Sequence, residues 1–426
     1  MPELGPSPLS AGQAQLSVDE ARERIHASIA AITQTECVPL LGALGRTLAT
    51  QVISPINVPA HDNSAMDGFA FDGALLAPCE ADNAELTLDV TGTLFAGQTP
   101  REALSGRQCL RIMTGAVMPA GADTVVPHEL CRVDGGGVHI APGLIRRGEN
   151  RRKCGEDLAQ GGLALAVGRT LRPADLGLIA SLGVEQVTVF RRLRVALFST
   201  GNELRTLGQT LDEACIFDSN RYSLMGALQR LGVEVIDLGL VRDDLAALQA
   251  TLQVAVEQAD VVLTSGGVSM GDADHIREVL ARMGQVDFWK VAMRPGRPFA
   301  FGPLRHNNKL AWLFALPGNP VAALVTFYAL AREALMVLAG AMPEPLPVLQ
   351  ARCAVAIRKR PGRTEFQRGI VARALDGGWQ VRLTGSQGAG VLRSLSQANA
   401  LIVLSHEQGS VAAGEPVDVW LFDGLV

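Results

Sequence analysis

A glycine-rich turn that follows an apolar run is the strongest chemical signal in this chain. The segment reads VVLTSGGVSMGDAD over residues 261–274 and ends in two acids, Asp272 and Asp274. Glycine leaves backbone N–H groups uncovered, so an anion can approach them closely, and carboxylates after the turn can hold a divalent cation. A tight strand-to-helix turn capped by Asp272 explains this segment equally well when it is taken alone. The residues that would bind the anion are Ser265, Gly266 and Gly267.

A second glycine turn and a basic segment favour the same kind of ligand. The turn reads LPGNP at residues 316–320, and the basic segment reads KVAMRPGRP at residues 290–298. Prolines beside the arginines fix the backbone, which lowers the entropy cost of clamping an oxyanion such as phosphate or molybdate. A solvated basic loop is the alternative. The residues concerned are Lys290, Arg294, Arg297, Pro298, Pro317, Gly318 and Asn319.

Other suggestive segments are ambiguous by themselves. Asp67 precedes a glycine in NSAMDG at residues 63–68, which is a common turn, and RRKCGED at residues 151–157 is typical of a surface charge run. Cys154 has no partnered His–Asp set, so we interpret it as incidental. The sequence contains no P-loop, no GxGxxG opening a helix and no GxSxG elbow, so P-loop ATP hydrolysis and dinucleotide chemistry are not supported.

The elements that must position these residues alternate between strands and helices from residue 193 to residue 338. The expected strands are 193–199, 233–240, 260–264, 286–293 and 311–316, and the expected helices are 219–231, 243–257, 272–283 and 320–338. This alternation predicts a parallel sheet with right-handed crossovers, whose ligands sit beyond the carboxyl ends of the strands. The candidate segments at such ends are 200–203, 242–244, 265–274 and 317–319.

The flanking segments have different patterns. Ser17 and Glu20 form a capping box that predicts a helix, and residues 172–182 predict another. After a proline-punctuated stretch at residues 55–59, residues 61 to about 138 are predicted to form short strands and turns. Residues 348–426 alternate with period two and contain no convincing helix, which predicts a small β-barrel or sandwich.

Composition limits the class of protein. A chain of 426 residues exceeds one ordinary core, and a net charge of -5 argues against sequence-independent nucleic-acid binding. Seven widely spaced cysteines without a CxxC motif, together with the lack of a signal-peptide pattern, predict a reducing, cytoplasmic location. The apolar segment 320–342 is interrupted by Arg332 and Glu333, so we interpret it as a buried or interface helix and not as a membrane span.

Ten ordered motifs resemble the bacterial molybdopterin molybdenumtransferase family, MoeA, which is related to the E domain of gephyrin. They extend over the chain from near residue 17 to the C-terminal region. They are DNSAMDGFA (62–70), RIMTGAVMPAGADTVV (111–126), CGEDLAQG (154–161), FSTGNEL (198–204), DSNRYSL (218–224), LVRDD (240–244), TSGGVSMGDAD (264–274), FWKVAMRPGRPFAFG (288–302), LPGNPVAA (316–323) and FQRG (366–369).

The resemblance implies a multidomain α/β plus β fold in an elongated homodimer. Domain I would be helical and discontinuous, and domain II would be a β insertion. Domain III would be a doubly wound α/β unit similar to molybdopterin adenylyltransferases, and domain IV a β-barrel. The implied boundaries are 17–55 and 145–191 for domain I, 56–144 for domain II, 192–342 for domain III and 343–426 for domain IV.

The reaction implied by the resemblance transfers molybdenum from molybdate to adenylylated molybdopterin, with AMP as the leaving group and Mg2+ required. The implied metal ligands are Glu203, Asp243 and Asp274. Asp67 and Thr114 would join the site from domain II, and the active cleft would be completed across the dimer. The implied substrate contacts are Lys290, Arg294, Arg297, Arg368, Asp157, Pro298, the 265–267 turn and the 317–319 turn.

Some positions depart from the family pattern. Asn202 stands where the family often has Asp, and Arg294 and Arg297 stand where Lys is frequent; Ala322 and Ala389 replace serines seen in some relatives. Because of Asn202, Ala322 and Ala389, a non-catalytic pterin carrier or scaffold is kept as an alternative. A molybdopterin adenylyltransferase is a second alternative, because domain III alone resembles that enzyme. The implied partners are a molybdopterin adenylyltransferase and acceptor molybdoenzymes, without nucleic acid or membrane.

Overall fold

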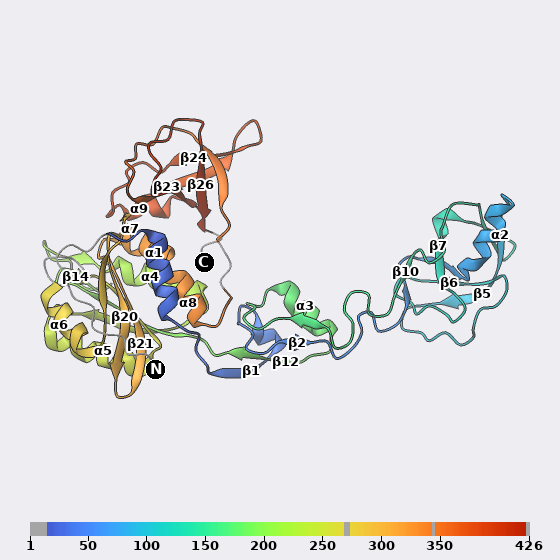
Figure 1. Ribbon diagram of the computed structural model, residues 1–426, viewed down its shortest axis with the longest axis horizontal. Coiled ribbons are helices and arrows are strands. Elements are labelled where there is room, and N and C mark those ends of the chain that lie inside the picture. Colours follow the sequence, from blue (N-terminus) through green and yellow to red (C-terminus); the bar gives the residue numbers. More distant parts are fainter. Residues whose placement is uncertain (1–14, 268–272, 343–345, 423–426) are drawn as a thin grey trace.

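The chain is elongated, with a large lobe at one end and a small lobe at the other (Figure 1). The computed structural model describes residues 15–267, 273–342 and 346–422, and for residues 273–276 it describes the backbone only. We name four regions. They are the α/β lobe (15–28 and 193–342), the barrel above it (346–422), the middle segment (29–58 and 158–192) and the distal lobe (59–157).

The first helix, α1 (Val18–Ser28), begins at the expected capping box. Ser17 Oγ accepts a hydrogen bond from Glu20 N at 3.1 Å, and the Glu20 carboxylate accepts one from Ser17 N at 2.7 Å. Its buried face lies in the core cluster of the α/β lobe. Arg22 Nε donates to Ala329 O at 2.7 Å, and its guanidinium lies 5.3 Å from the centre of the Trp420 ring. The helix therefore packs against the α/β lobe and the barrel, whereas the sequence grouped it with the middle segment.

The central sheet of the α/β lobe is mixed, not wholly parallel. Its strand order is β16 (Glu234–Val241), β13 (Arg194–Thr200), β17 (Val261–Ser265), β21 (Lys309–Leu316), β20 (Pro298–His306) and β18 (Asp287–Lys290). The first four strands are parallel, but β20 runs antiparallel to both of its neighbours. The prediction of a parallel sheet was wrong at this edge. Asn307 and Asn308 adopt positive φ angles of 45° and 62°, which suits a tight hairpin turn between β20 and β21.

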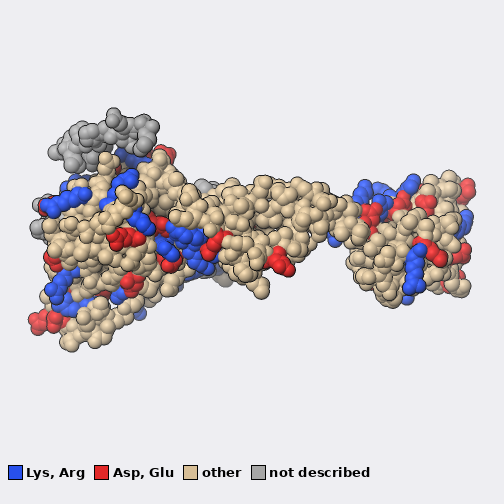
Figure 2. Space-filling view, turned by 90° about the horizontal axis from the view of Figure 1, so that it is seen from below, with Lys and Arg blue, Asp and Glu red and all other residues tan. Residues whose placement is uncertain are grey.

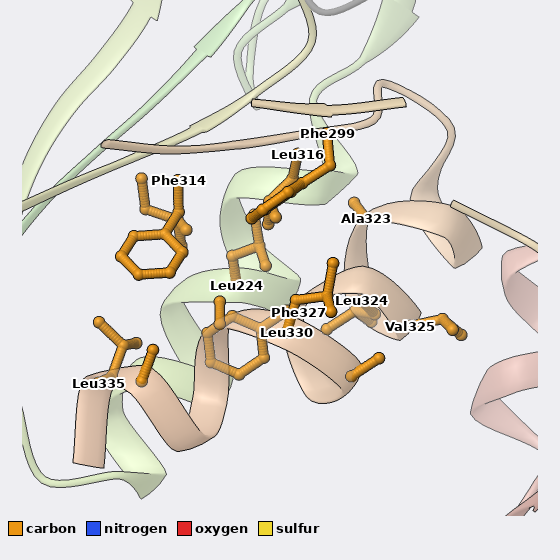
Figure 3. Packing of buried hydrophobic residues seen from close by; sticks show 14 of the residues in the cluster. Leu224, Phe299, Phe314, Leu316, Ala323, Leu324, Val325, Phe327, Leu330 and Leu335 are labelled. Atoms are coloured by element: carbon orange, nitrogen blue, oxygen red, sulfur yellow. The ribbon is translucent and has the colours of Figure 1, made fainter. Parts of the chain in front are cut away.

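Helices cover both faces of this sheet. One face carries α4 (Ser219–Arg230) and a long helix composed of α7 (Pro320–Thr326), the π-helical turn η4 (Phe327–Ala331) and α8 (Arg332–Leu338); the other carries α5 (Leu245–Gln258) and α6 (Ala273–Met283). Figure 3 shows Phe327, Leu330 and Leu335 of the long helix facing Phe314. Within the described part of the chain, Pro320–Leu338 alone is long and apolar enough to cross a membrane, and 72% of its apolar window is buried. It is a core helix, as expected.

The middle segment and the distal lobe are mostly short strands. The middle segment contains β1 (Thr35–Pro39) paired with β12 (Gln186–Phe190), β2 (Val52–Ile53) paired with β11 (Leu163–Leu165), η1 (Leu40–Ala43) and α3 (Pro173–Ser181). It is therefore less helical than the sequence suggested. The distal sheet has the order β7 (Thr124–Pro127), β4 (Gly68–Phe71), β6 (Gln108–Ile112), β5 (Leu86–Leu94), β9 (Gly137–Ile140) and β8 (Arg132–Asp134).

The C-terminal region is a closed five-stranded barrel. Its strands are β22 (Leu349–Cys353), β24 (Trp379–Leu383), β23 (Thr364–Arg373), β25 (Ala400–Leu404) and β26 (Pro416–Leu421), and the β23–β25 pairing closes the ring. One short helix, α9 (Leu392–Ser396), was not expected from the sequence. A strand of the α/β lobe, β19 (Met293–Arg294), pairs with β23 and fastens the barrel to the lobe.

Candidate active site

The carboxyl ends of the parallel strands form the predicted edge. Strand β17 ends at Ser265 and β21 ends at Leu316, and Gly266 N donates to Leu316 O at 3.1 Å across the two turns. Gly266 has a φ of +95°, and a Cβ there would lie 2.5 Å from Thr200 O. Any other residue would be strained at this positive φ angle, and its Cβ would clash with Thr200 O. Glycine is therefore required where the ends of the three strands approach one another. The 265–267 and 317–319 turns are thus brought together.

Asn220, which the sequence reasoning did not single out, joins the two turns. Its Nδ2 group donates to Ser265 Oγ at 2.6 Å and to Gly318 O at 2.6 Å. The side chain is buried in the first turn of α4. The Ser265 hydroxyl is therefore directed into the protein. The signal available in the sequence was the DSNRYSL motif, in which an amide follows a helix cap.

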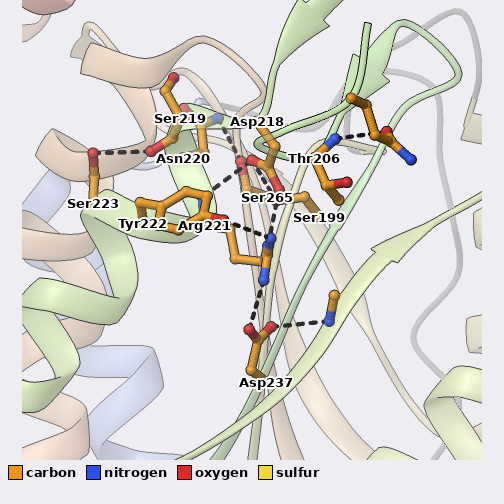
Figure 4. A network of polar contacts seen from close by, with 12 residues as sticks. Ser199, Thr206, Asp218, Ser219, Asn220, Arg221, Tyr222, Ser223, Asp237 and Ser265 are labelled. Carbon is orange, nitrogen blue, oxygen red and sulfur yellow. Dashed lines mark hydrogen bonds and ion pairs between the residues drawn. The ribbon is translucent and has the colours of Figure 1, made fainter.

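An ion-pair network that is buried at Asp218 and Arg221 lies beside Asn220 in the first turn of α4 (Figure 4). Asp218 caps α4, accepts a hydrogen bond from Ser199 Oγ at 3.0 Å and pairs with Arg221 at 3.2 Å. Arg221 also contacts Asp237 at 2.5 Å, and these acids raise its pKa against the opposing effect of burial. Since the network links β13, α4 and β16, it fixes the first turn of α4 relative to the strand ends.

A cavity of 430 Å³ lies between the α/β lobe and the barrel. Its lobe side contains Arg294, Arg297, Pro298 and residues 317–319, and its barrel side contains Arg363 and residues 387–389. Among the described residues that line it, three are arginines and none is acidic. Guanidinium groups and glycine-turn N–H groups are suited to phosphate or another tetrahedral oxyanion. Ala322 and Ala389 also line it, without hydroxyl groups.

Arg368, predicted to hold oxyanion charge, is 1% exposed and lines a smaller neighbouring cavity of 160 Å³. Its Nη2 donates to Ser386 O at 3.1 Å and Gly388 O at 3.0 Å, and its Nε donates to Ser394 Oγ at 3.1 Å. Burial, assisted by the nearby Arg294 cation, lowers its pKa to about 10. These bonds shape the loop at the barrel side of the main cavity, while direct contact of Arg368 with substrate stays a prediction.

The predicted metal ligands lie at the same edge of the sheet. Glu203 and Asp243 are exposed and follow the neighbouring strands β13 and β16, and Asn202 Oδ1 accepts a hydrogen bond from Asp243 N at 3.3 Å. The side chain of Asp274, in α6, lies outside the described residues, as does Asp272. Among the side chains that are described, no group of three His, Cys, Asp or Glu residues is placed to hold a metal ion.

Three predicted residues lie elsewhere. Asp67 and Thr114 belong to the distal lobe, at the opposite end of the chain from the cavity (Figure 1). There Thr114 N and Thr114 Oγ1 both donate to Asp67 Oδ1 at 2.7 Å, and these bonds, the backbone one first, lower the pKa of Asp67. Asp157 is exposed at the border of the distal lobe, where its N–H donates to Val58 O at 3.1 Å.

Lys290 ends β18 in the α/β lobe. It is exposed and is not among the residues that line either cavity. Within one subunit, the structure therefore brings together the two glycine turns, Arg294, Arg297 and Pro298. It does not bring Asp67, Thr114 or Asp157 to them.

Three family models cover nearly all of the chain. Residues 16–183 match the MoeA N-terminal region (domain I and II), residues 196–337 match a probable molybdopterin binding domain, and residues 350–422 match the MoeA C-terminal region (domain IV).

Curated relatives and solved structures agree with these matches. A molybdopterin molybdenumtransferase from Haemophilus influenzae is 40% identical over 412 residues, covering 96% of this chain and 100% of the relative. One from Nostoc sp. is 37% identical over 388 residues, covering 90% and 88%. Two crystal structures of Pyrococcus horikoshii MoeA proteins have TM-scores of 0.73 and 0.81 at 30% and 26% identity, each covering 96% of this chain and 99% and 100% of theirs. The chain belongs to the MoeA family of molybdopterin molybdenumtransferases.

Proposed function

We propose that this chain transfers molybdenum from molybdate to the dithiolene of adenylylated molybdopterin and releases AMP. The family to which it belongs gives the coarser activity, molybdenum insertion into molybdopterin during cofactor biosynthesis. One observation carries the finer proposal: three arginines and a glycine turn meet in a single cavity whose described lining has no acidic residue.

The cavity chemistry suits two anionic substrates. Molybdate is a tetrahedral oxyanion, and Arg294, Arg297 and Arg363 offer planar guanidinium donors for its oxygens. The adenylylated pterin contributes a pyrophosphate-like linkage, which the N–H groups of the 265–267 and 317–319 turns would bind. Because donors held in place before the reaction need little reorganisation, they stabilise the charge that develops on the departing phosphate.

The acids at the strand ends fit a divalent cation. Glu203 and Asp243 present carboxylate oxygens, which are the ligands that Mg2+ prefers. We propose that they hold Mg2+ together with Asp274. When bound, the cation would offset the negative charge of the pyrophosphate-like linkage.

The distal residues require a second copy of the chain. Asp67 and Thr114 lie far from the cavity of their own subunit, so a partner must present them if they act there. The middle segment offers a dimer surface: its face in Figure 2 carries few charged side chains. The exposed apolar residues of the middle segment are Leu41, Leu44, Ile53, Ile56, Leu163 and Val167. We therefore propose a homodimer in which the distal lobe of one subunit completes the site of the other.

The cellular setting follows from the proposed substrates. All seven cysteines are free, which suits the reducing cytoplasm. We propose that a molybdopterin adenylyltransferase supplies the adenylylated pterin and that apo-molybdoenzymes accept the product.

The test is an assay with purified protein, adenylylated molybdopterin, molybdate and Mg2+, in which AMP and active cofactor are both measured. The proposal expects both products, and it expects Asp243→Ala to lose both while it keeps its melting temperature, because Asp243 is exposed. Tight ligand binding without either product would identify a carrier. ATP-dependent adenylylation of free molybdopterin would identify an adenylyltransferase.

A further inference from the structure

One buried carboxylate lies among the cations beside the two cavities. Glu365 is 1% exposed, at the start of β23 in the barrel. Its Oε1 accepts hydrogen bonds from Arg363 Nε at 2.8 Å and is 2.7 Å from Arg363 Nη2, and Arg294 Nη1 lies 4.0 Å from the same oxygen. Its Oε2 accepts a hydrogen bond from Gln367 Nε2 at 3.0 Å. Both arginines face the main cavity.

The backbone sets this arrangement before any side chain is placed. Strands β19 and β23 pair in parallel, with Arg294 directly opposite Glu365, and Thr364 N donates to Ala292 O at 2.8 Å. The carboxylate therefore comes from the barrel, and one of its cations comes from the α/β lobe. This pairing does not depend on the Glu365 side chain.

The two arginines need an orienting partner. The side chains of Arg294 and Arg363 are 57% and 39% exposed, so without a partner each would lose much rotamer entropy on binding an anion. A third cation, Lys359, also interacts electrostatically with Glu365. Its Nζ, however, is held by a hydrogen bond that it donates to Gln408 O at 2.6 Å. Glu365 thus acts chiefly on the arginines that face the cavity.

We propose that Glu365 is a positioning residue, which holds Arg363 and Arg294 in the orientation that receives a tetrahedral oxyanion. This inference rests on the proposed function of the cavity. Because both arginine contacts fall on one oxygen of a buried carboxylate, the two guanidinium groups are oriented together. Binding of the oxyanion should therefore respond to Glu365 even though Glu365 does not line the main cavity.

The test measures molybdate binding by calorimetry for the full-length protein. Glu365→Gln keeps the side-chain shape and removes the charge, so molybdate should bind about tenfold more weakly with the enthalpy of binding reduced. Glu365→Asp should recover part of the affinity. The matched control is Asp376→Asn, which breaks an exposed ion pair with Arg352 in the same barrel and should bind like the wild type.

A double-mutant cycle separates positioning from general stability. Glu365→Gln and Arg363→Gln should each weaken molybdate binding. The double variant should lose less than the product of the two single losses, because both substitutions remove the Glu365–Arg363 contact and only the effect on Arg294 is added. If the unpaired Arg363 destabilises the Glu365→Gln variant, the double variant, which lacks this arginine, keeps the test usable. Unchanged binding in Glu365→Gln, or losses that multiply in the double variant, would overturn the inference. Failure of the wild type to bind molybdate would instead overturn the proposed oxyanion site, and with it this inference.

Discussion

The distal lobe and the cavity beside the barrel organise their charged groups in different ways. In the distal lobe, Asp67 is exposed, and Thr114 supplies both of the hydrogen bonds that its carboxylate accepts. At the cavity, arginines from β19 and from the residue before β23 meet the 317–319 turn, and the buried residues Asn220 and Glu365 contact this turn and these arginines. The distal carboxylate should therefore tolerate substitution without loss of fold, whereas changes at the cavity should affect both stability and binding.

The largest expected effect is a loss of AMP release in two variants, one with a substitution in the distal lobe and one with a substitution at the cavity. Asp67→Ala and Arg294→Ala should each reduce AMP release about 100-fold, since each removes a charged contact to substrate or product. If the site is shared between subunits, a refolded equal mixture of the two variants should recover about a quarter of wild-type activity, because half of the dimers then contain one intact site. A mixture as inactive as its components would contradict the shared site.

Asn220→Ala should affect stability more than any distal change. It leaves the buried Ser265 hydroxyl and Gly318 carbonyl without their amide partner, which costs about 1–3 kcal/mol in the free energy of unfolding. Chemical denaturation measures this cost. Ser223→Ala, on the same helix, removes a local bond to Ser219 O and serves as the control, with an expected change below about 0.5 kcal/mol. Equal losses in the two variants would remove the proposed link between the turns.

Thr114→Val tests the distal carboxylate by pH. The pKa of Asp67 is lowered in the folded chain, so its ionised form is retained above the unfolded value of about 3.9 and is lost only as pH falls through the lower folded value. Valine removes the hydroxyl donor but keeps the backbone N–H, so the pKa of Asp67 should rise part of the way to its ordinary value. NMR titration of the carboxyl group measures it. An unchanged pKa would show that the hydroxyl does not contribute.

The smallest effect is expected from Thr326→Val, because Thr326 packs behind Gly296, a residue of the cavity wall, and does not itself line the cavity. Thr326 is fully buried, and among the described residues its Oγ1 has no hydrogen-bond partner. Replacing an unpaired hydroxyl with a methyl group should leave stability unchanged or raise it by up to about 1 kcal/mol, and AMP release should be unaltered. A clear loss of activity would contradict this expectation and show that the hydroxyl supports the cavity wall at Gly296.

The sequence predicted the parts of the fold that follow from local periodicity. The helix from Pro320, the strands that end at Thr200 and Ser265, and the glycine turns all agree with the structure. Strand β20 was missed because its antiparallel direction depends on the turn at Asn307 and Asn308. The spacing of apolar residues does not distinguish a parallel strand from an antiparallel one. The packing of α1 on the α/β lobe is a long-range contact, which no local pattern contains.

The candidate site was predictable in its chemistry but not in its placement. Arg294, Arg297 and the two turns were identified, and they line or adjoin one cavity. The sequence could not show that Arg368 is buried against loop carbonyls, or that Asn220 and Glu365 orient their neighbours, because these roles depend on contacts between segments far apart in the chain. It also could not show that Asp67 lies at the opposite end of its own subunit.

The most direct test is a single-turnover measurement with enzyme in excess over adenylylated molybdopterin, in the presence of Mg2+ and with or without molybdate. The products to quantify in the same sample are AMP and molybdenum-bound pterin. If molybdenum is transferred at this site, AMP release should depend on molybdate and the two products should form in equal amounts. AMP release at the same rate without molybdate, or without molybdenum-bound pterin, would contradict molybdenum transfer at this site.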